Sequence, residues 1–67
     1  MTFAGGFPTE RIARDRAAAD FPTRRIYIIE SGGQFYVEPD DGGAMIRSWE
    51  REVFHGLGRN APSALPP

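Results

Sequence analysis

Two consecutive glycines, Gly32 and Gly33, separate two short runs of β-branched and aromatic residues. The runs cover residues 26–29 and 35–37, and residues of these types favour a pleated sheet. A two-residue glycine loop can adopt the positive φ angles that type I′ and type II′ turns need. The pattern therefore predicts an antiparallel β-hairpin closed by a tight turn.

The turn also predicts the register of the hairpin, with Ser31 opposite Gln34 and Tyr27 opposite Glu38. Because side chains alternate between the two faces of a strand, one face carries apolar residues that belong to the core: Ile26, Ile28, Phe35 and Val37. The other face carries a second apolar set, framed by Gln34 and Glu38: Tyr27, Ile29 and Tyr36. This second face therefore needs a cover, either from this chain or from another.

Residues 45–57 show apolar side chains at positions 46, 49, 53 and 57. Spacings of three and four keep these positions on one stripe of a helix. Asp40 and Asp41 precede the segment, where carboxylates favour a helix N-terminus, and Gly58 follows it, where a glycine ends a helix. The pattern predicts a second, amphipathic helix in which Trp49 is buried against Ile28 and Val37.

A first helix is predicted over residues 9–19. Thr9 can accept a hydrogen bond as the N-cap, and Glu10 lies in the first turn. Glu10 and Arg14 form a favourable i,i+4 pair, and Pro22 ends the segment. Ile12 is nearly the only large apolar residue, so an arm that becomes ordered on a partner is the alternative.

These segments predict an α+β fold in the order α-β-β-α: helix, two-stranded antiparallel hairpin, amphipathic helix. The expected domain covers residues 1–59, with a loose arm at 1–6, and residues 60–67 form a proline-rich flexible tail. Two strands alone are marginal in water. Helix cover or a dimer that extends the sheet is therefore required.

Length and charge exclude several classes of function. With 67 residues the chain has room for one domain, and a formal net charge of −1 creates no global field for nucleic acid or an anionic membrane. No apolar run approaches the ~20 residues of a membrane span. Without cysteine there is no disulfide or thiolate metal site. The start of the chain lacks a secretory signal pattern, so we expect a cytoplasmic protein, in bacteria or in a cell that its genome enters.

The sequence offers little for catalysis. His55 is the single histidine and is expected on the second helix, near Arg51 and Glu52, without an orienting partner or a nucleophile at motif spacing. We therefore expect a boundary histidine, no enzyme activity and no cofactor. The acidic segment 38–43 is expected to be a solvated turn. A knob for a basic partner and a metal site are its alternatives, although calcium-loop spacing is missing.

The expected function is non-catalytic protein binding. The predicted partner-binding residues lie on the second hairpin face and the acidic turn: Tyr27, Ile29, Tyr36, Glu38, Asp40 and Asp41. Two alternatives leave this face unavailable, namely a homodimer and a cover formed by Phe3 and Phe7 folding back. A small nucleic-acid-binding protein, with scattered arginines and the two tyrosines as contacts, is the alternative function.

In size and lack of catalytic groups, the chain is similar in type to small phage-encoded inhibitors such as the anti-CRISPR proteins. No residue motif carries this likeness, so it transfers no functional residue. It implies a mobile-element inhibitor or adaptor of a larger host complex as the expected role.

Overall fold

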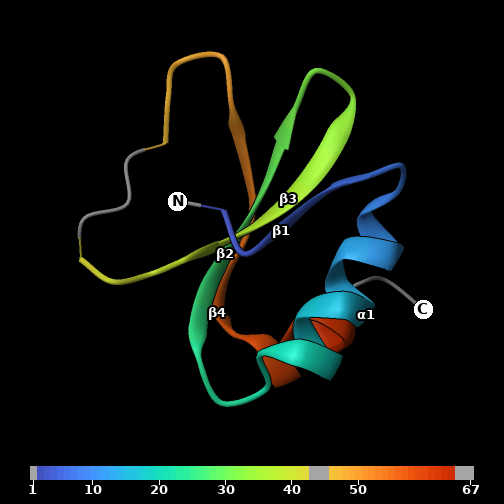
Figure 1. Cartoon of the computed structure of the whole chain (residues 1–67), viewed down its shortest axis with the longest axis vertical. Helices are drawn as coiled ribbons and strands as arrows, with labels where there is room; N and C mark the ends of the chain where they lie inside the picture. The colour runs from blue at the N-terminus through green and yellow to red at the C-terminus, as the bar shows by residue number, and fades with distance from the viewer. Residues whose placement is uncertain (1, 43–45, 65–67) are drawn as a thin grey trace.

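The computed structural model describes residues 2–42 and 46–64. Within them, four antiparallel strands form one sheet in the order β1-β3-β2-β4, and one α-helix packs on it (Figure 1). The elements follow one another as β1 (Ala4–Phe7), α1 (Glu10–Asp20), β2 (Arg25–Ser31), β3 (Gln34–Pro39), β4 (Arg51–Leu57) and the 3₁₀ turns η1 (Gly58–Asn60) and η2 (Pro62–Ala64). The predicted α-β-β-α fold with a two-stranded hairpin is therefore wrong.

The hairpin itself is confirmed, with its register. β2 and β3 pair antiparallel, with Ser31 opposite Gln34 and Tyr27 opposite Glu38. Gly32 has a φ of 61° and Gly33 a φ of 80°. Positive φ at both central positions is the requirement of a type I′ turn, which matches the twist of the flanking strands.

The N-terminal segment is an edge strand where the sequence suggested a loose arm. β1 pairs with β3, and β3 lies between β1 and β2. Since β1 and β2 both run antiparallel to β3, they are parallel to each other, and α1 connects them as the crossover of a split β-α-β unit. A register shift between Gly5 and Phe7 is accommodated at Gly6, whose φ is 81°.

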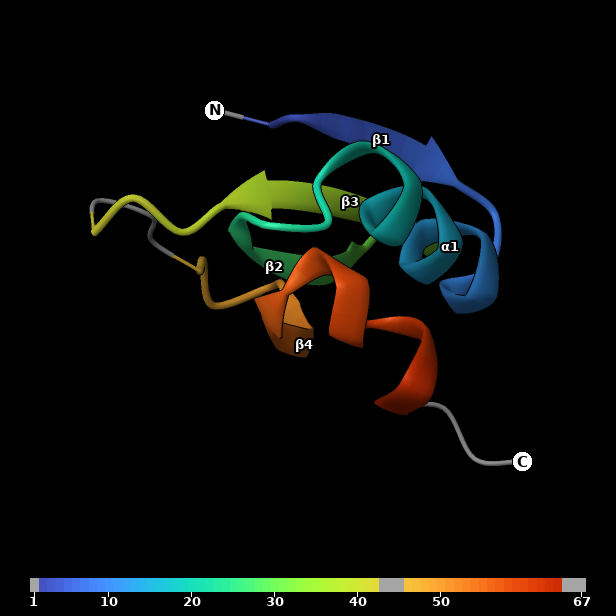
Figure 2. The ribbon, with the colours of Figure 1, turned by 90° about the horizontal axis from the view of Figure 1, so that it is seen from below.

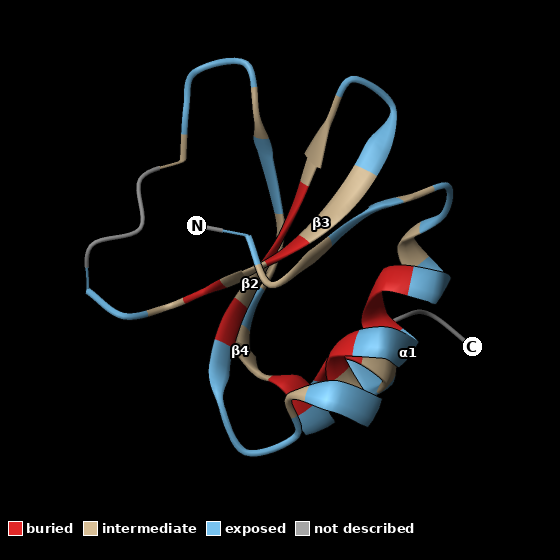
Figure 3. Ribbon diagram, viewed as in Figure 1, coloured by how far each residue is buried: buried red, intermediate tan, exposed pale blue. Residues whose placement is uncertain are grey.

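The first helix is confirmed. The Thr9 side chain accepts a hydrogen bond from the Ile12 N–H at 3.2 Å and caps it. α1 approaches the sheet through small residues, because Ala13 and Ala17 have no exposed surface, whereas Ile12 is 43% exposed. Figure 3 shows the buried positions on the strands and on the side of α1 that faces them.

The second helix is wrong, and so is the burial of Trp49. The C-terminal half of that segment is β4, which pairs antiparallel with β2, and Trp49 is 69% exposed in the preceding connection. Met45 lies outside the described residues. The expected helix-ending role of Gly58 is also wrong, since this buried glycine follows a strand and begins η1.

A β-bulge explains why the pattern of β4 indicated a helix. The register with β2 shifts between Ile28 and Ile29, so that Val53 is the additional residue on β4. Val53 and its neighbour Phe54 both pack against the core, which alternation along a regular strand does not permit. The edge of β2 also needed a partner, and β4 supplies it.

The C-terminal segment, expected to be a flexible tail, packs against the helix as far as it is described. Ala61, between η1 and η2, has no exposed surface and belongs to the core. The Arg14 side chain of α1 donates to the Ala61 carbonyl oxygen at 2.8 Å. Across residues 2–42 and 46–64, no helix is long and apolar enough to cross a membrane.

Candidate functional site

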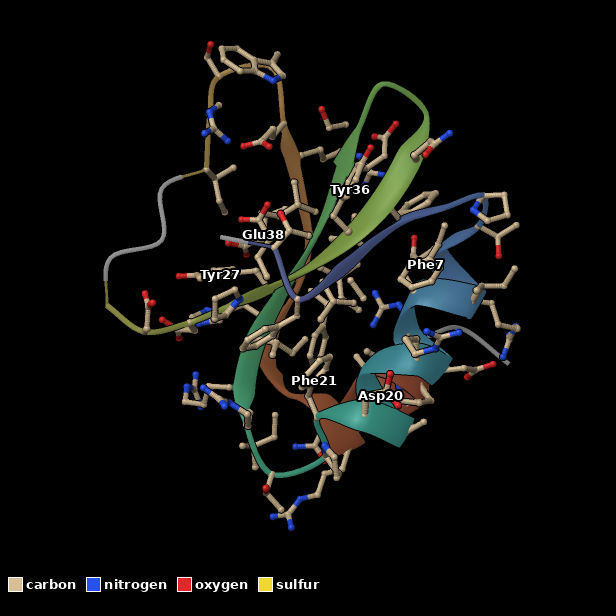
Figure 4. The ribbon with its side chains drawn as sticks, in the orientation of Figure 1. Phe7, Asp20, Phe21, Tyr27, Tyr36 and Glu38 are labelled. Carbon is tan, nitrogen blue, oxygen red and sulfur yellow. The ribbon has the colours of Figure 1, made fainter. Side chains whose placement is uncertain are left out.

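The face of the sheet opposite α1, called the outer face here, holds most of the predicted site residues. α1 and the connection between β3 and β4 project from opposite sides of the sheet (Figures 1 and 2). Figure 4 shows Tyr27 and Glu38 on the side of this connection, and Phe7 and Phe21 on the side of the helix. By alternation, Tyr36 shares the outer face with Tyr27 and Glu38.

Phe3 and Phe7 do not cover the outer face. Both pack against the core on the α1 side. The Phe3 ring stacks on Phe21, with 4.4 Å between ring centroids, and the Arg16 guanidinium lies 5.3 Å from the centroid of the Phe7 ring. The alternative in which these two residues fold back over the outer face is therefore wrong.

The predicted site residues on the outer face differ in how much of their surface is exposed to solvent. Ile29 has no exposed surface, so it supports the face and offers no contact to a partner. Tyr36 lies over Gly5 of the neighbouring strand, where a Cβ atom would overlap its ring. Tyr27, Tyr36 and Glu38 are half-buried, and Asp41 is exposed.

His55 has an orienting partner, contrary to the expectation. Its Nε2 lies 2.5 Å from Asp40 Oδ2, and its ring stacks on Tyr27 at 4.1 Å between centroids, with 13° between the planes. The β2–β4 register places Tyr27 opposite His55. Asp40 is held just beyond β3 because its N–H donates to the Arg25 carbonyl oxygen at 3.0 Å. Sequence reasoning placed His55 on a helix, with Arg51 and Glu52 as its charged neighbours, and did not consider Asp40.

The hydrogen bond from His55 lowers the pKa of the Asp40 carboxyl below its ordinary value of 3.8. Desolvation opposes this change, and the positive charge of Arg25 adds to it, with Arg25 Nε 3.6 Å from Asp40 Oδ2. The hydrogen bond from His55 and the charge of Arg25 therefore both favour the ionised form of Asp40. An ionised carboxylate accepts the Nε2 proton of His55 and leaves Nδ1 as the second ring nitrogen.

The arrangement supplies half of a general-base pair. A catalytic base needs both an orienting group and a proton to take within hydrogen-bond distance. Asp40 orients His55, but among the described residues no serine, threonine or tyrosine hydroxyl hydrogen-bonds to the ring. The described residues also contain no group of three histidine or carboxylate side chains that could hold a metal ion.

Asp40→Asn is expected to remove part of the acid sensitivity of folding. Because the folded pKa lies below the unfolded value, the unfolded chain takes up the proton first as the pH falls. The stabilisation is therefore complete above pH 3.8 and is lost as the pH falls through the lowered pKa. Urea unfolding measured from pH 2 to pH 6 should show a shallower decline for Asp40→Asn.

Asp15→Asn is the matched control, because Asp15 is an exposed residue of α1. No ion pair or hydrogen bond of its side chain is found within the described parts of the chain. If the free energy of unfolding falls equally with decreasing pH in Asp40→Asn and in the unmodified chain, the hydrogen bond between Asp40 and His55 does not contribute to folding stability.

An exposed tryptophan was missed by the sequence reasoning. Residues 47–50, called the Trp49 turn, close on themselves: the Glu50 N–H donates to the Arg47 carbonyl oxygen at 2.9 Å, and the Arg47 N–H donates to Glu50 Oε1 at 2.7 Å. The Glu50 side chain is only 8% exposed. The Arg47 guanidinium lies 5.8 Å from the centroid of the Trp49 ring. The turn therefore holds a large aromatic side chain out in solvent.

The position of Trp49 could not be read from spacing, because the same residue completes an apparent helical stripe. The clue in the sequence is that Trp49 lies between two charged residues, Arg47 before it and Glu50 after it.

Comparison with protein-family models, with curated proteins and with solved structures finds no match to this chain.

Proposed function

We propose that this chain is a small non-catalytic protein-binding module that contacts its partner through the Trp49 turn. Trp49 is 69% exposed, and this observation carries the proposal. Tryptophan and arginine are enriched among the residues that dominate the energy of protein interfaces. A module of this size that lacks its own chemistry acts by occupying or bridging surfaces of a larger complex, as an inhibitor or an adaptor.

The turn is preorganised for binding. Hydrogen bonds between Arg47 and Glu50 close the backbone around Trp49, and the Glu50 side chain is only 8% exposed. Holding a contact residue in place before binding reduces the entropy lost in the complex. A tryptophan that contributes nothing to the core yet is held in this way supports a role in recognition.

The pairing of arginines with carboxylates favours a protein partner over nucleic acid. Salt bridges join five arginines to carboxylates of this chain: Arg14, Arg16, Arg25, Arg47 and Arg51. One face of the Tyr27 ring is occupied by His55, so only the opposite face could stack on a base. Affinity for nucleic acid grows with the number of phosphates that Lys and Arg side chains neutralise, and this pairing of charges leaves fewer arginines for that purpose.

Trp49→Ala is expected to leave folding nearly unchanged and to abolish capture of the partner. Exposed substitutions usually change stability by less than about 0.5 kcal/mol, whereas loss of a central interface tryptophan costs at least about 2 kcal/mol of binding. The measurement is an affinity pull-down from nuclease-treated cytosolic extract, paired with urea unfolding of the purified variants.

Ile12→Ala provides the control, since Ile12 is the second exposed large apolar residue in the described parts of the chain and lies on α1, away from the turn. Capture by Ile12→Ala should equal that of the unmodified chain. The proposal fails if Trp49→Ala retains the same partners, or if those partners disappear when nucleic acid is digested.

A further inference from the structure

Two carboxylates of the outer face have no cationic partner among the residues that the structure describes. Glu38 accepts one hydrogen bond, from Thr2 Oγ1 at 3.5 Å, and Glu52 is exposed. Within residues 2–42 and 46–64, neither lies within salt-bridge distance of a cation. In contrast, the described structure pairs the carboxylates of Glu10, Asp20, Glu30, Asp40 and Glu50 with cationic side chains.

These two carboxylates lie on different sides of the outer face. Glu38 on β3 is opposite Tyr27 on β2, and Tyr36 is two residues before Glu38 on the same face. Glu52 on β4 is opposite Ile29, which is itself opposite Tyr36. Side chains directly opposite across an antiparallel pair have Cβ atoms about 4.5–5.5 Å apart. Glu38 therefore lies beside both tyrosines, whereas Glu52 lies across the face, beside Ile29.

On the described part of this face, one arginine and the histidine already have a carboxylate partner. Arg25 and His55 both contact the Asp40 carboxylate, at 3.6 Å and 2.5 Å. Within the described residues, neither Glu38 nor Glu52 therefore receives a cation from its own face. A guanidinium group suits the surroundings, because it stacks on aromatic rings and forms paired hydrogen bonds to carboxylates.

We infer that the outer face binds an arginine-rich segment of a protein partner, with Glu38 accepting one guanidinium group beside Tyr27 and Tyr36 and Glu52 accepting another across the face. The inference rests on the proposed function, since it specifies the chemistry of that partner. The connection that carries the Trp49 turn projects from the same side of the sheet (Figures 1 and 2). An arginine-rich segment on the face and an apolar pocket on Trp49 can therefore belong to one partner.

The test is a titration of the ¹⁵N-labelled chain with a blocked hexa-arginine peptide, followed by amide chemical shifts. We expect shifts in β2, β3 and β4 around the outer-face residues and none in α1. Blocked hexa-lysine should bind more weakly, since an ammonium group offers no planar fork, and hexa-glutamate should cause no shifts.

Two double variants with the same net charge separate a site from general attraction. Glu38→Gln with Glu52→Gln should weaken hexa-arginine binding at least about tenfold, because charge-assisted bonds are lost. Asp15→Asn with Asp20→Asn removes two exposed carboxylates of α1 and should change the affinity less than about twofold, since attraction from exposed charges at a distance is screened by salt.

The inference is overturned by equal weakening in both double variants, by shifts that map to α1, or by no shifts at all. It is also overturned if sedimentation shows a dimer of the unmodified chain that Glu38→Gln with Glu52→Gln dissociates, because a second copy then occupies the face. The shift map does not depend on Trp49. A failed map with intact Trp49-dependent capture therefore rejects only the inference, and the reverse result rejects only the proposed function.

Discussion

Arg14→Ala is expected to abolish cooperative unfolding or to lower the free energy of unfolding by at least about 3 kcal/mol. Arg14 is 4% exposed and donates to the Ala61 carbonyl oxygen at 2.8 Å and to the Val53 carbonyl oxygen at 3.3 Å. Its Nε donates to Glu10 Oε2 at 2.7 Å. The buried Ala61 acceptor left without a donor costs about 1–3 kcal/mol, and loss of the part-buried bond to Val53 adds to this cost. A core of this size rarely supplies more than about 3–5 kcal/mol.

The effect reaches beyond α1, because one guanidinium group joins three elements. It links the helix to the bulge of β4 and to the segment between η1 and η2, and it lies 5.2 Å from the centroid of the Phe54 ring. Urea unfolding followed by circular dichroism measures the loss. Amide exchange at Ala61 tests whether the C-terminal segment detaches first.

Arg16→Ala is the matched control, two residues along the same helix. The Arg16 side chain is half exposed and pairs with Asp20 at 3.7 Å. Exposed pairs of this kind contribute about 0–1 kcal/mol. If Arg14→Ala and Arg16→Ala unfold at the same urea concentration, the buried guanidinium does not hold these elements together.

Gly58→Ala is expected to be the second strongly destabilising change. A Cβ atom at this position would lie 2.5 Å from the Ala17 carbonyl oxygen and still closer to the Phe21 carbonyl oxygen. Both obstacles are backbone atoms, so no side-chain rotation relieves the overlap. Overpacking typically costs about 1–3 kcal/mol, and we expect the upper end of that range or more. Thermal and urea unfolding provide the measurement.

The close approach at Gly58 joins the end of β4 to the end of α1. Its N–H donates to the Arg24 carbonyl oxygen at 3.0 Å, and the next N–H, of Arg59, donates to the Pro22 carbonyl oxygen at 3.1 Å. Gly56→Ala is the comparison, because its Cβ would meet only the movable ring of Phe54, at 3.1 Å. Equal stability of Gly58→Ala and the unmodified chain would contradict the packing described here.

Local sequence determined the elements whose signals act over a few residues. The Gly32-Gly33 turn and the flanking β-branched runs specified the hairpin and its register, because turn geometry and alternation are local constraints. The Thr9 cap and the alanines that follow specified α1 for the same reason. These predictions agree with the structure at the level of individual pairs.

The tertiary structure alone decided the identity of β4. The spacing of its apolar residues fitted a helix, and the bulge at Val53 concealed the alternation of a strand. Only the unpaired edge of β2 could show that another strand was needed, and that edge lies more than twenty residues away in sequence. The consequence was large, because a helix predicted a buried Trp49 and the strand assignment leaves Trp49 exposed.

The candidate site divides in the same way. The shared face of Tyr27 and Tyr36 follows from the hairpin, so the sequence by itself determined it. The bond between His55 and Asp40, fifteen residues apart, and the exposure of Trp49 depend on where β4 pairs. A contact between distant segments becomes favourable only when the whole sheet has formed. For that reason its signal is absent from any short stretch of the chain.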